Sequence, residues 1–156
     1  GSITADSDEI ERLANLKNEW YLEYVSNLSE KDILPGIPAF IEDLKARNVR
    51  IGLASASKNA KPILTKIGMI DLFESIVDGL STTKAKPDPE VFIKCAQNLN
   101  TNPQDCFVIE DAKAGVEAAI NAGMKVIGVG TKGELGKANK VIDSTHLLSI
   151  DLLREI

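Results

Sequence analysis

A chain of 156 residues is long enough for one domain with a sizeable core. Its composition, 44% hydrophobic and 26% charged, is that of a soluble globular protein, and its net charge of −5 argues against nonspecific binding to nucleic acid. No apolar run approaches the length of a membrane span. The two cysteines, Cys95 and Cys106, lie in apolar contexts without metal-site spacing, which indicates buried thiols in a reducing, cytoplasmic setting.

The first predicted element is a long helix over residues 6–28. Asp6 or Ser7 can cap its start, and Glu9 stands where a capping box would need it. Apolar side chains follow at helical spacing, namely Ile10, Leu13, Leu16, Trp20, Val25 and Leu28. We therefore expect this helix to pack its apolar stripe against the core.

Beyond residue 33 the sequence alternates helices with short apolar strands. Helical patterns cover residues 37–48, 60–67 and 91–99, another ends at 122, and a last one begins at 147. Strand patterns cover residues 49–54, 76–77, 106–110, 125–129 and 141–142. Short strands that alternate with helices are typical of a parallel sheet with flanking helices, so the predicted fold class is α/β.

Two adjacent carboxylates, Glu110 and Asp111, end the strand predicted at 106–110. The carboxyl edge of a parallel sheet is where α/β proteins bind ligands. Two carboxylates held there need a cation, a proton or solvent, and oxygen ligands of this kind suit Mg²⁺. The alternative is a solvated acidic strand end in which Asp111 caps the next helix.

A second candidate site follows the strand predicted at 49–54. Ser55, Ala56 and Ser57 lie between this strand and the next helix. Hydroxyls and backbone N–H groups in such a place form a ready anion site. Ordinary helix capping by Ser57 is the alternative interpretation.

Lys86 precedes Pro87 in a loop that prolines stiffen. A lysine held by such a loop can point a fixed positive charge at a phosphate, and a solvated surface lysine is the alternative.

Residues 128–133 match the dinucleotide-binding pattern G-x-G-x-x-G. Gly136 and Asn139 interrupt the helix that a dinucleotide site needs, so we expect no dinucleotide there.

The segments that carry these residues resemble the haloacid dehalogenase-like (HAD) phosphotransferase superfamily. They are Leu34–Ile37, Ile51–Asn59, Lys86–Phe92, Ile109–Gly115 and Gly128–Gly130. The resemblance runs from about Glu9 to the C-terminus and implies a HAD-like Rossmannoid parallel sheet with flanking helices. It also implies that residues 1–30 are a remnant of a helical cap domain and that residues 31–156 are the α/β core without its first strand.

The resemblance implies roles for the candidate residues in phosphoryl transfer by positioning and charge compensation. Ser55 and the Ala56 N–H would bind the transferring phosphoryl group, and Lys86 would neutralise that group and its nucleophile. Ser55 and Lys86 are thus the catalytic candidates. The remaining candidates are Ser57, Lys58 and Asn59 for the second phosphate of a sugar substrate, and Glu110 and Asp111 for the Mg²⁺ cofactor.

The sequence departs from the family at its first strand, which carries Asp-x-Asp as nucleophile and general acid/base. Asp6-Ser7-Asp8 has this spacing, but no apolar strand precedes it and a helix follows. We therefore expect an N-terminally truncated or nicked member. The missing strand would lie between the strands ending at Ser55 and Glu110, so its absence would leave a cleft and two strands without a partner.

The activity that the resemblance implies is that of an isomerase, which interconverts β-glucose 1-phosphate and glucose 6-phosphate through an aspartyl-phosphate. Two alternatives stay open, a sugar-phosphate phosphatase of the same superfamily and a non-catalytic fragment. The expected partners are a hexose phosphate and the missing N-terminal segment as a separate peptide, with neither nucleic acid nor membrane. This chain alone is expected to be inactive.

Overall fold

The computed structural model describes residues 7–156, except for the side chains at positions 7, 8 and 14. Its strands form two parallel sheets. One pairs β1 with β2, and the other has the order β3, β4, β5. The strands are β1 (Gly52–Ala54), β2 (Ser75–Val77), β3 (Phe107–Glu110), β4 (Lys125–Val129) and β5 (Lys140–Ile142). Parallel strands with flanking helices confirm the predicted α/β class.

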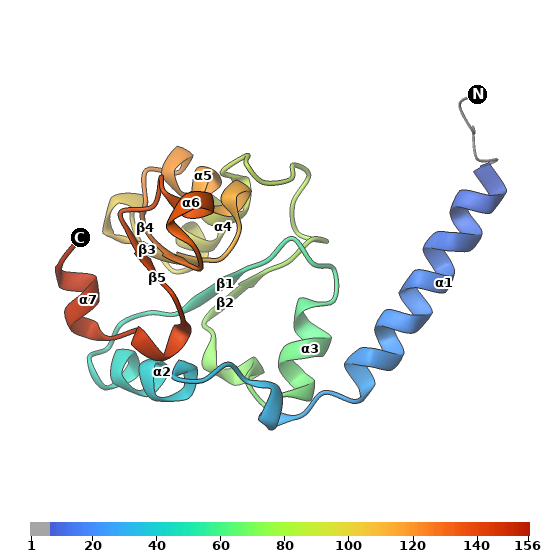
Figure 1. The fold of residues 1–156 in the computed structure, drawn as a ribbon, viewed down its shortest axis with the longest axis horizontal. Coiled ribbons are helices and arrows are strands. Elements are labelled where there is room, and N and C mark those ends of the chain that lie inside the picture. The colour runs from blue at the N-terminus through green and yellow to red at the C-terminus, as the bar shows by residue number, and fades with distance from the viewer. Residues whose placement is uncertain (1–6) are drawn as a thin grey trace.

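Helices cover both faces of the strands (Figure 1). These are α2 (Ile37–Ala46), α3 (Ala60–Lys66), α4 (Glu90–Asn98), α5 (Lys113–Asn121), α6 (Lys132–Leu135) and α7 (Ile150–Arg154). A further helix, α1 (Ser7–Ser26), does not cover the strands. Short 3-10 turns lie at Glu30–Asp32, Ile70–Leu72, Pro103–Asp105 and Thr145–Leu147. Apolar side chains of α4, α5 and α6 pack on one face, and those of α2, α3 and α7 pack on the other.

Strand β4 is the centre of the larger core. Val126 and Ile127 are neighbours in the sequence and point to opposite faces, and both are fully buried. Val126 belongs to the cluster formed with α4 and α5, whereas Ile127 belongs to the cluster formed with α2 and α7. A strand buried on both faces reads as an apolar run, which residues 126–129 form after the exposed Lys125, and this is why the sequence pattern located β4 well.

The expected interruption of the sheet is present. Within residues 7–156, β1 pairs only with β2 and β3 pairs only with β4, so one edge of each strand is unpaired. Phe107 and Ile109, both apolar and both in β3, are 43% and 38% exposed. These unpaired edges belong to the two strands between which the sequence predicts a further strand.

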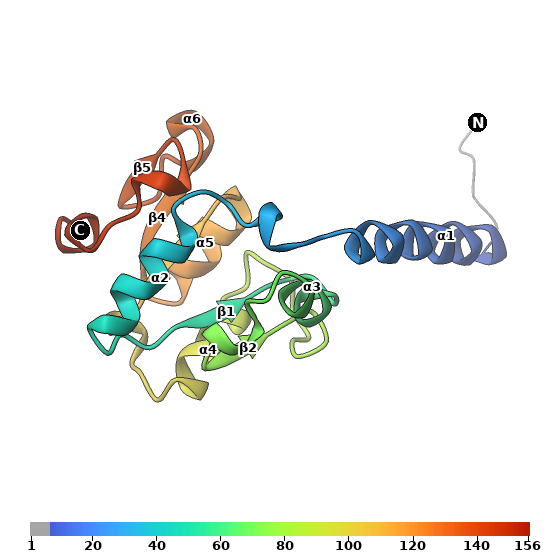
Figure 2. The same ribbon diagram turned by 90° about the horizontal axis from the view of Figure 1, so that it is seen from below.

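The prediction for the first helix is wrong in one respect. α1 forms, but Figures 1 and 2 show most of it projecting away from the strands, and α3 is the helix that it contacts. Trp20 and Tyr24 are 64% and 63% exposed, and Val25 is the buried side chain of the stripe. Helical periodicity predicts an apolar face but not what covers it. The proposed capping by Asp6 or Ser7 lies outside the described residues and side chains.

Two predicted boundaries also move. The strand predicted at 49–54 begins at Gly52, because the Val49 N–H donates to Leu44 O at the end of α2 instead of entering a ladder. The helix predicted from residue 147 begins at Ile150, after the 3-10 turn. No helix between residues 7 and 156 combines the length and the hydrophobicity needed to cross a membrane.

Candidate functional site

The turn after β1 presents hydroxyl and amide donors. The Ser55 N–H donates to Val77 O at 2.8 Å, which ties the turn to β2. Ser55 Oγ accepts the Ser57 N–H and Ser57 Oγ accepts the Asn59 N–H, each at 3.1 Å. Asn59 is the N-cap residue of α3, so Ser57 folds the turn and does not cap the helix. The Ala56 N–H meets no acceptor among residues 7–156, and both hydroxyls keep their own protons to donate.

Lys86 links the ends of the two sheets. Its Nζ lies 2.7 Å from Glu110 Oε2 at the end of β3 and 3.5 Å from Ala54 O at the end of β1. It also lies 4.6 Å from the centre of the Phe92 ring, within cation–π range. The side chain is 16% exposed, which excludes a solvated surface lysine. An ammonium has three donors, so at least one remains for an anion.

A small cavity brings Lys86 and the turn after β1 together. Its volume is about 190 Å³, and Ala56, Gly79, Lys86 and Val91 line it together with loop residues 82–85. Ala56 and Lys86 therefore border the same space, and a shared anion there stays a prediction. Lys58 is exposed on the turn, and the structure leaves its role as a prediction.

Glu110 is held in one orientation by its neighbours. Its Oε1 accepts the N–H groups of Asp111 and Ala112, each at 3.1 Å, while Oε2 accepts from Lys86. A Cβ on Gly115 would overlap the Glu110 carboxyl group. Only glycine permits the carboxylate to lie this close to the first turn of α5, and no pattern in the sequence indicates this requirement.

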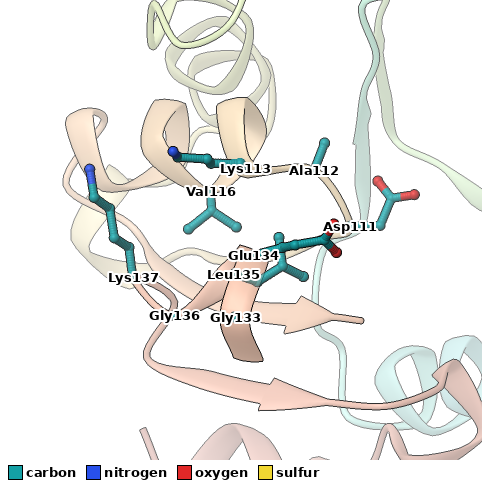
Figure 3. Close-up of a pocket in the computed structure, with 9 residues that line it drawn as sticks. All are labelled: Asp111, Ala112, Lys113, Val116, Gly133, Glu134, Leu135, Gly136 and Lys137. Atoms are coloured by element: carbon teal, nitrogen blue, oxygen red, sulfur yellow. The ribbon is translucent and has the colours of Figure 1, made fainter. Parts of the chain in front are cut away.

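Asp111 is the exposed member of the carboxylate pair. Ala112, not Asp111, is the N-cap residue of α5. Asp111 borders a pocket of about 660 Å³ between the start of α5 and α6, with Lys113 and Lys137 at its other end (Figure 3).

Among the described residues no three His, Cys, Asp or Glu side chains come together as metal ligands would. Glu110 and Asp111 could supply two oxygen ligands of a Mg²⁺ ion, with the others to come from water, phosphate or another segment, and this role stays a prediction.

Glu90 shapes the loop that carries Lys86, and no sequence motif marks it. Its carboxylate accepts the Lys84 N–H at 2.8 Å and the Thr83 N–H at 3.1 Å. These two backbone hydrogen bonds are the main reason why the pKa of Glu90 falls from 4.5 to about 2. The contacts reach back six and seven residues from the first residue of α4, a spacing with no standard sequence signal.

We predict that the Lys86 loop loosens in acid because Glu90 must then be protonated. A carboxyl group whose pKa is lowered by folding stabilises the folded state above its unfolded value of 4.5, and this stabilisation is lost as the pH falls through about 2. The carboxyl ¹³C signal of Glu90 should titrate near pH 2. The stability difference between the wild type and Glu90→Gln should shrink over the same range. A Glu90 midpoint near 4.5 would contradict the prediction.

The chain matches known proteins over most of its length. The sequence profile of the haloacid dehalogenase-like hydrolase family matches residues 2–129. β-Phosphoglucomutase of Bacillus subtilis (strain 168) is 42% identical over 147 residues, which are 94% of this chain and 65% of that protein. The putative phosphatase YhcW of the same organism is 34% identical over 124 residues, 78% of this chain and 55% of that protein.

A solved structure shows the same fold. The crystal structure of β-phosphoglucomutase from Clostridium difficile superposes with a TM-score of 0.92 at 42% identity, covering 98% of this chain and 69% of that one. A phosphorylated carbohydrates phosphatase of Thermotoga maritima is 32% identical over 95 residues, which are 60% of this chain and 44% of that protein. The chain thus spans less than two thirds of its sequence relatives, and both mutases and phosphatases are among them.

Proposed function

The chain belongs to the haloacid dehalogenase-like hydrolase family, and from this membership we propose that it is the phosphate-binding core of a β-phosphoglucomutase. Such an enzyme interconverts β-glucose 1-phosphate and glucose 6-phosphate through an aspartyl-phosphate. The observation that carries the proposal is the position of Lys86, whose ammonium contacts the ends of β1 and β3 and lines a cavity with Ala56. The identity of 42% to a β-phosphoglucomutase supports the choice within the family.

The transferring phosphoryl group would bind between the turn and the lysine. The Ser55 hydroxyl and the Ala56 N–H would donate to two of its oxygens, and the Lys86 ammonium would donate to a third. Three fixed donors compensate the anionic charge without any reorganisation of solvent during transfer. Glu110 keeps Lys86 in place through the 2.7 Å ion pair, so it acts on the phosphate through the lysine.

The second phosphate of the sugar would bind farther along the same turn. Ser57, Lys58 and Asn59 follow Ala56 directly, and Lys58 is exposed and so is available to a ligand. Two phosphate sites on one turn suit a bisphosphate intermediate, which a mutase needs and a simple phosphatase does not. Asp111 and Glu110 would hold Mg²⁺, which supplies positive charge beside the phosphoryl oxygens.

The nucleophile would come from outside the described residues. We propose that residues 31–156 form the α/β core, that residues 1–30 belong to a helical cap, and that a separate or connected segment with Asp-x-Asp completes the sheet. Support comes from the unpaired edges of β1 and β3 and from the exposed face of α1. Cys95 and Cys106 are both free thiols, which favours a cytoplasmic protein.

A sugar-phosphate phosphatase is the second candidate, because phosphatases of this family are also similar to the chain. The deciding experiment uses a chimera in which the matched 65% of the Bacillus subtilis β-phosphoglucomutase is replaced by this chain. Incubated with β-glucose 1-phosphate, Mg²⁺ and a bisphosphate activator, it should form glucose 6-phosphate with little free phosphate. Release of phosphate without glucose 6-phosphate would identify a phosphatase and refute the mutase proposal.

We predict weak Mg²⁺ binding by the 156-residue chain itself. Glu110 already accepts three hydrogen bonds, so Asp111 is the carboxylate most open to the ion. Mg²⁺ is dehydrated reluctantly and gains little from one or two carboxylates without a phosphate. Titration calorimetry should give a shallow curve without defined stoichiometry, and Asp111→Asn should flatten it further. Tight binding of one ion per chain would contradict this prediction.

A further inference from the structure

Asp78 is a buried carboxylate with no role in the site as described so far. It follows β2 directly and is 3% exposed. Its Oδ1 accepts the Ser81 hydroxyl at 2.7 Å and the Leu80 N–H at 3.0 Å, and its Oδ2 lies 3.9 Å from Lys61 Nζ. The Ser81 hydrogen bond is the main cause that lowers the pKa of Asp78, so the buried group is an anion. Burying a charge is costly, and here it organises a backbone turn.

This turn touches the residues that present the Ala56 N–H. The Gly79 N–H donates to Ser57 O at 3.1 Å. A Cβ at Gly79 would overlap Ala56 O, so the two backbones are in direct contact. A change in the path of the chain at Asp78 and Gly79 would therefore act on the Ala56 carbonyl group and on Ser57, one peptide beyond the Ala56 N–H.

The same turn also reaches the loop that carries Lys86. Lys94 Nζ donates to Ser81 O at 2.7 Å and lies 3.3 Å from Glu90 Oε1. Glu90 in turn holds the backbone of Lys84, two residues before Lys86. Hydrogen bonds thus run continuously from the Asp78 carboxylate to the base of the Lys86 loop.

We propose that Asp78 is a positioning residue that holds the phosphate-binding turn and the Lys86 loop in register, so that the Ala56 N–H and the Lys86 ammonium meet one phosphoryl group. The inference rests on the proposed function, since it assumes that this group binds between the two. Asp78 touches neither the phosphate nor Lys86. It acts through Gly79 on one side and through Ser81 on the other.

The test uses the 156-residue chain, with inorganic phosphate as the probe in NMR titrations and with amide hydrogen exchange measured in parallel. Asp78→Ala should weaken phosphate binding about tenfold, the size expected for hydrogen bonds to a charged group, and should speed exchange at residues 56–58 and 80–84. Asp78→Asn keeps an oxygen for Leu80 and Ser81 and should restore both properties nearly to the wild type. Asp43→Ala, at an exposed acidic residue of α2, is the matched control.

Ser81→Ala removes only the hydroxyl group that donates to Asp78, and it replaces Asp78→Ala in the test if that variant does not fold. It should weaken phosphate binding severalfold.

The positioning role is refuted if amide hydrogen exchange at residues 56–58 is unchanged in these variants. It is also refuted if this exchange becomes faster while phosphate affinity stays at the wild-type value. If the wild type binds no phosphate, the proposed function fails and the positioning role fails with it. If the wild type and Asp78→Ala bind equally, only the positioning role fails.

Discussion

No turnover of β-glucose 1-phosphate is expected from the 156-residue chain alone, whereas the chimera with the rest of the Bacillus subtilis enzyme is expected to be active. Aspartate-based phosphoryl transfer needs a carboxylate in line with the phosphorus and a second group that moves the proton. Within the described residues, Glu110 is bound to Lys86 and to two backbone N–H groups, and Ser55 Oγ accepts within its own turn. Glu110 and Ser55 are therefore not placed to attack, and Asp111 would be occupied by Mg²⁺.

The position of Lys86 also indicates where a nucleophilic aspartate on an added strand would lie. Lys86 Nζ contacts Ala54 of β1 and Glu110 of β3, and both residues end their strands. A parallel strand inserted between β1 and β3 would end at the same edge, so its last residues would lie beside the Lys86 ammonium and the cavity at Ala56. An aspartate there would have its charge offset by the lysine and would face the bound phosphate.

The measurement starts from chain purified to a single mass, so that no second polypeptide is present. Glucose 6-phosphate formation is assayed with β-glucose 1-phosphate, Mg²⁺ and a bisphosphate activator, and a Glu110→Ala/Asp111→Ala variant gives the background. The rest of the Bacillus subtilis enzyme is then supplied, covalently or as a separate polypeptide. Turnover by the chain alone above the double variant would mean that the nucleophile lies within these residues.

The added segment should also raise the thermal stability of the chain. A strand in the gap would cover Phe107 and Ile109, which are 43% and 38% exposed. Burial of apolar surface is favourable, and pairing of both free edges satisfies backbone groups that otherwise face water. Phe107→Ser, tested in the isolated chain and in the chimera, should cost more stability in the chimera because its ring is buried only there.

Sequence patterns singled out the candidate residues because most of them lie where strands end. Ser55, Glu110 and Asp111 follow short apolar runs, and strand ends of a parallel sheet meet at one edge. Lys86 was a weaker prediction from the residues alone, since a loop lysine is usually solvated. Its burial depends on Phe92 and Glu110, which lie six and 24 residues away and have no fixed spacing to it.

Other features depended on packing that periodicity does not encode. The stripe of α1 was expected in a core, yet Trp20 is 64% exposed because few described elements reach that helix. Cys106 was expected to be buried like Cys95, but it is only half-buried, near the unpaired edge of β3. Asp78 and Glu90 organise backbone through contacts with loops, and neither carries a motif that marks it.

Lys86→Ala should nearly abolish phosphoryl transfer in the active chimera. Loss of one preorganised donor to a transferring group costs about 100-fold or more in kcat. Removal of this cation also leaves the Glu110 carboxylate, 10% exposed, without its counter-charge beside an anionic phosphate. Lys45→Ala is the matched control, because Lys45 is an exposed lysine of α2 that does not line the cavity.

Lys58→Ala in the same chimera should separate binding from chemistry. If Lys58 holds the sugar's non-transferring phosphate, its loss should raise KM for the hexose phosphate about tenfold and change kcat much less. Lys86→Ala should show the opposite split, with kcat falling at saturating substrate, and circular dichroism should show both variants folded. An unchanged KM in Lys58→Ala would contradict a second phosphate site at this turn. The reason to prefer a mutase over a phosphatase would then be lost. An unchanged kcat in Lys86→Ala would mean that the cation between β1 and β3 serves the fold and not the reaction.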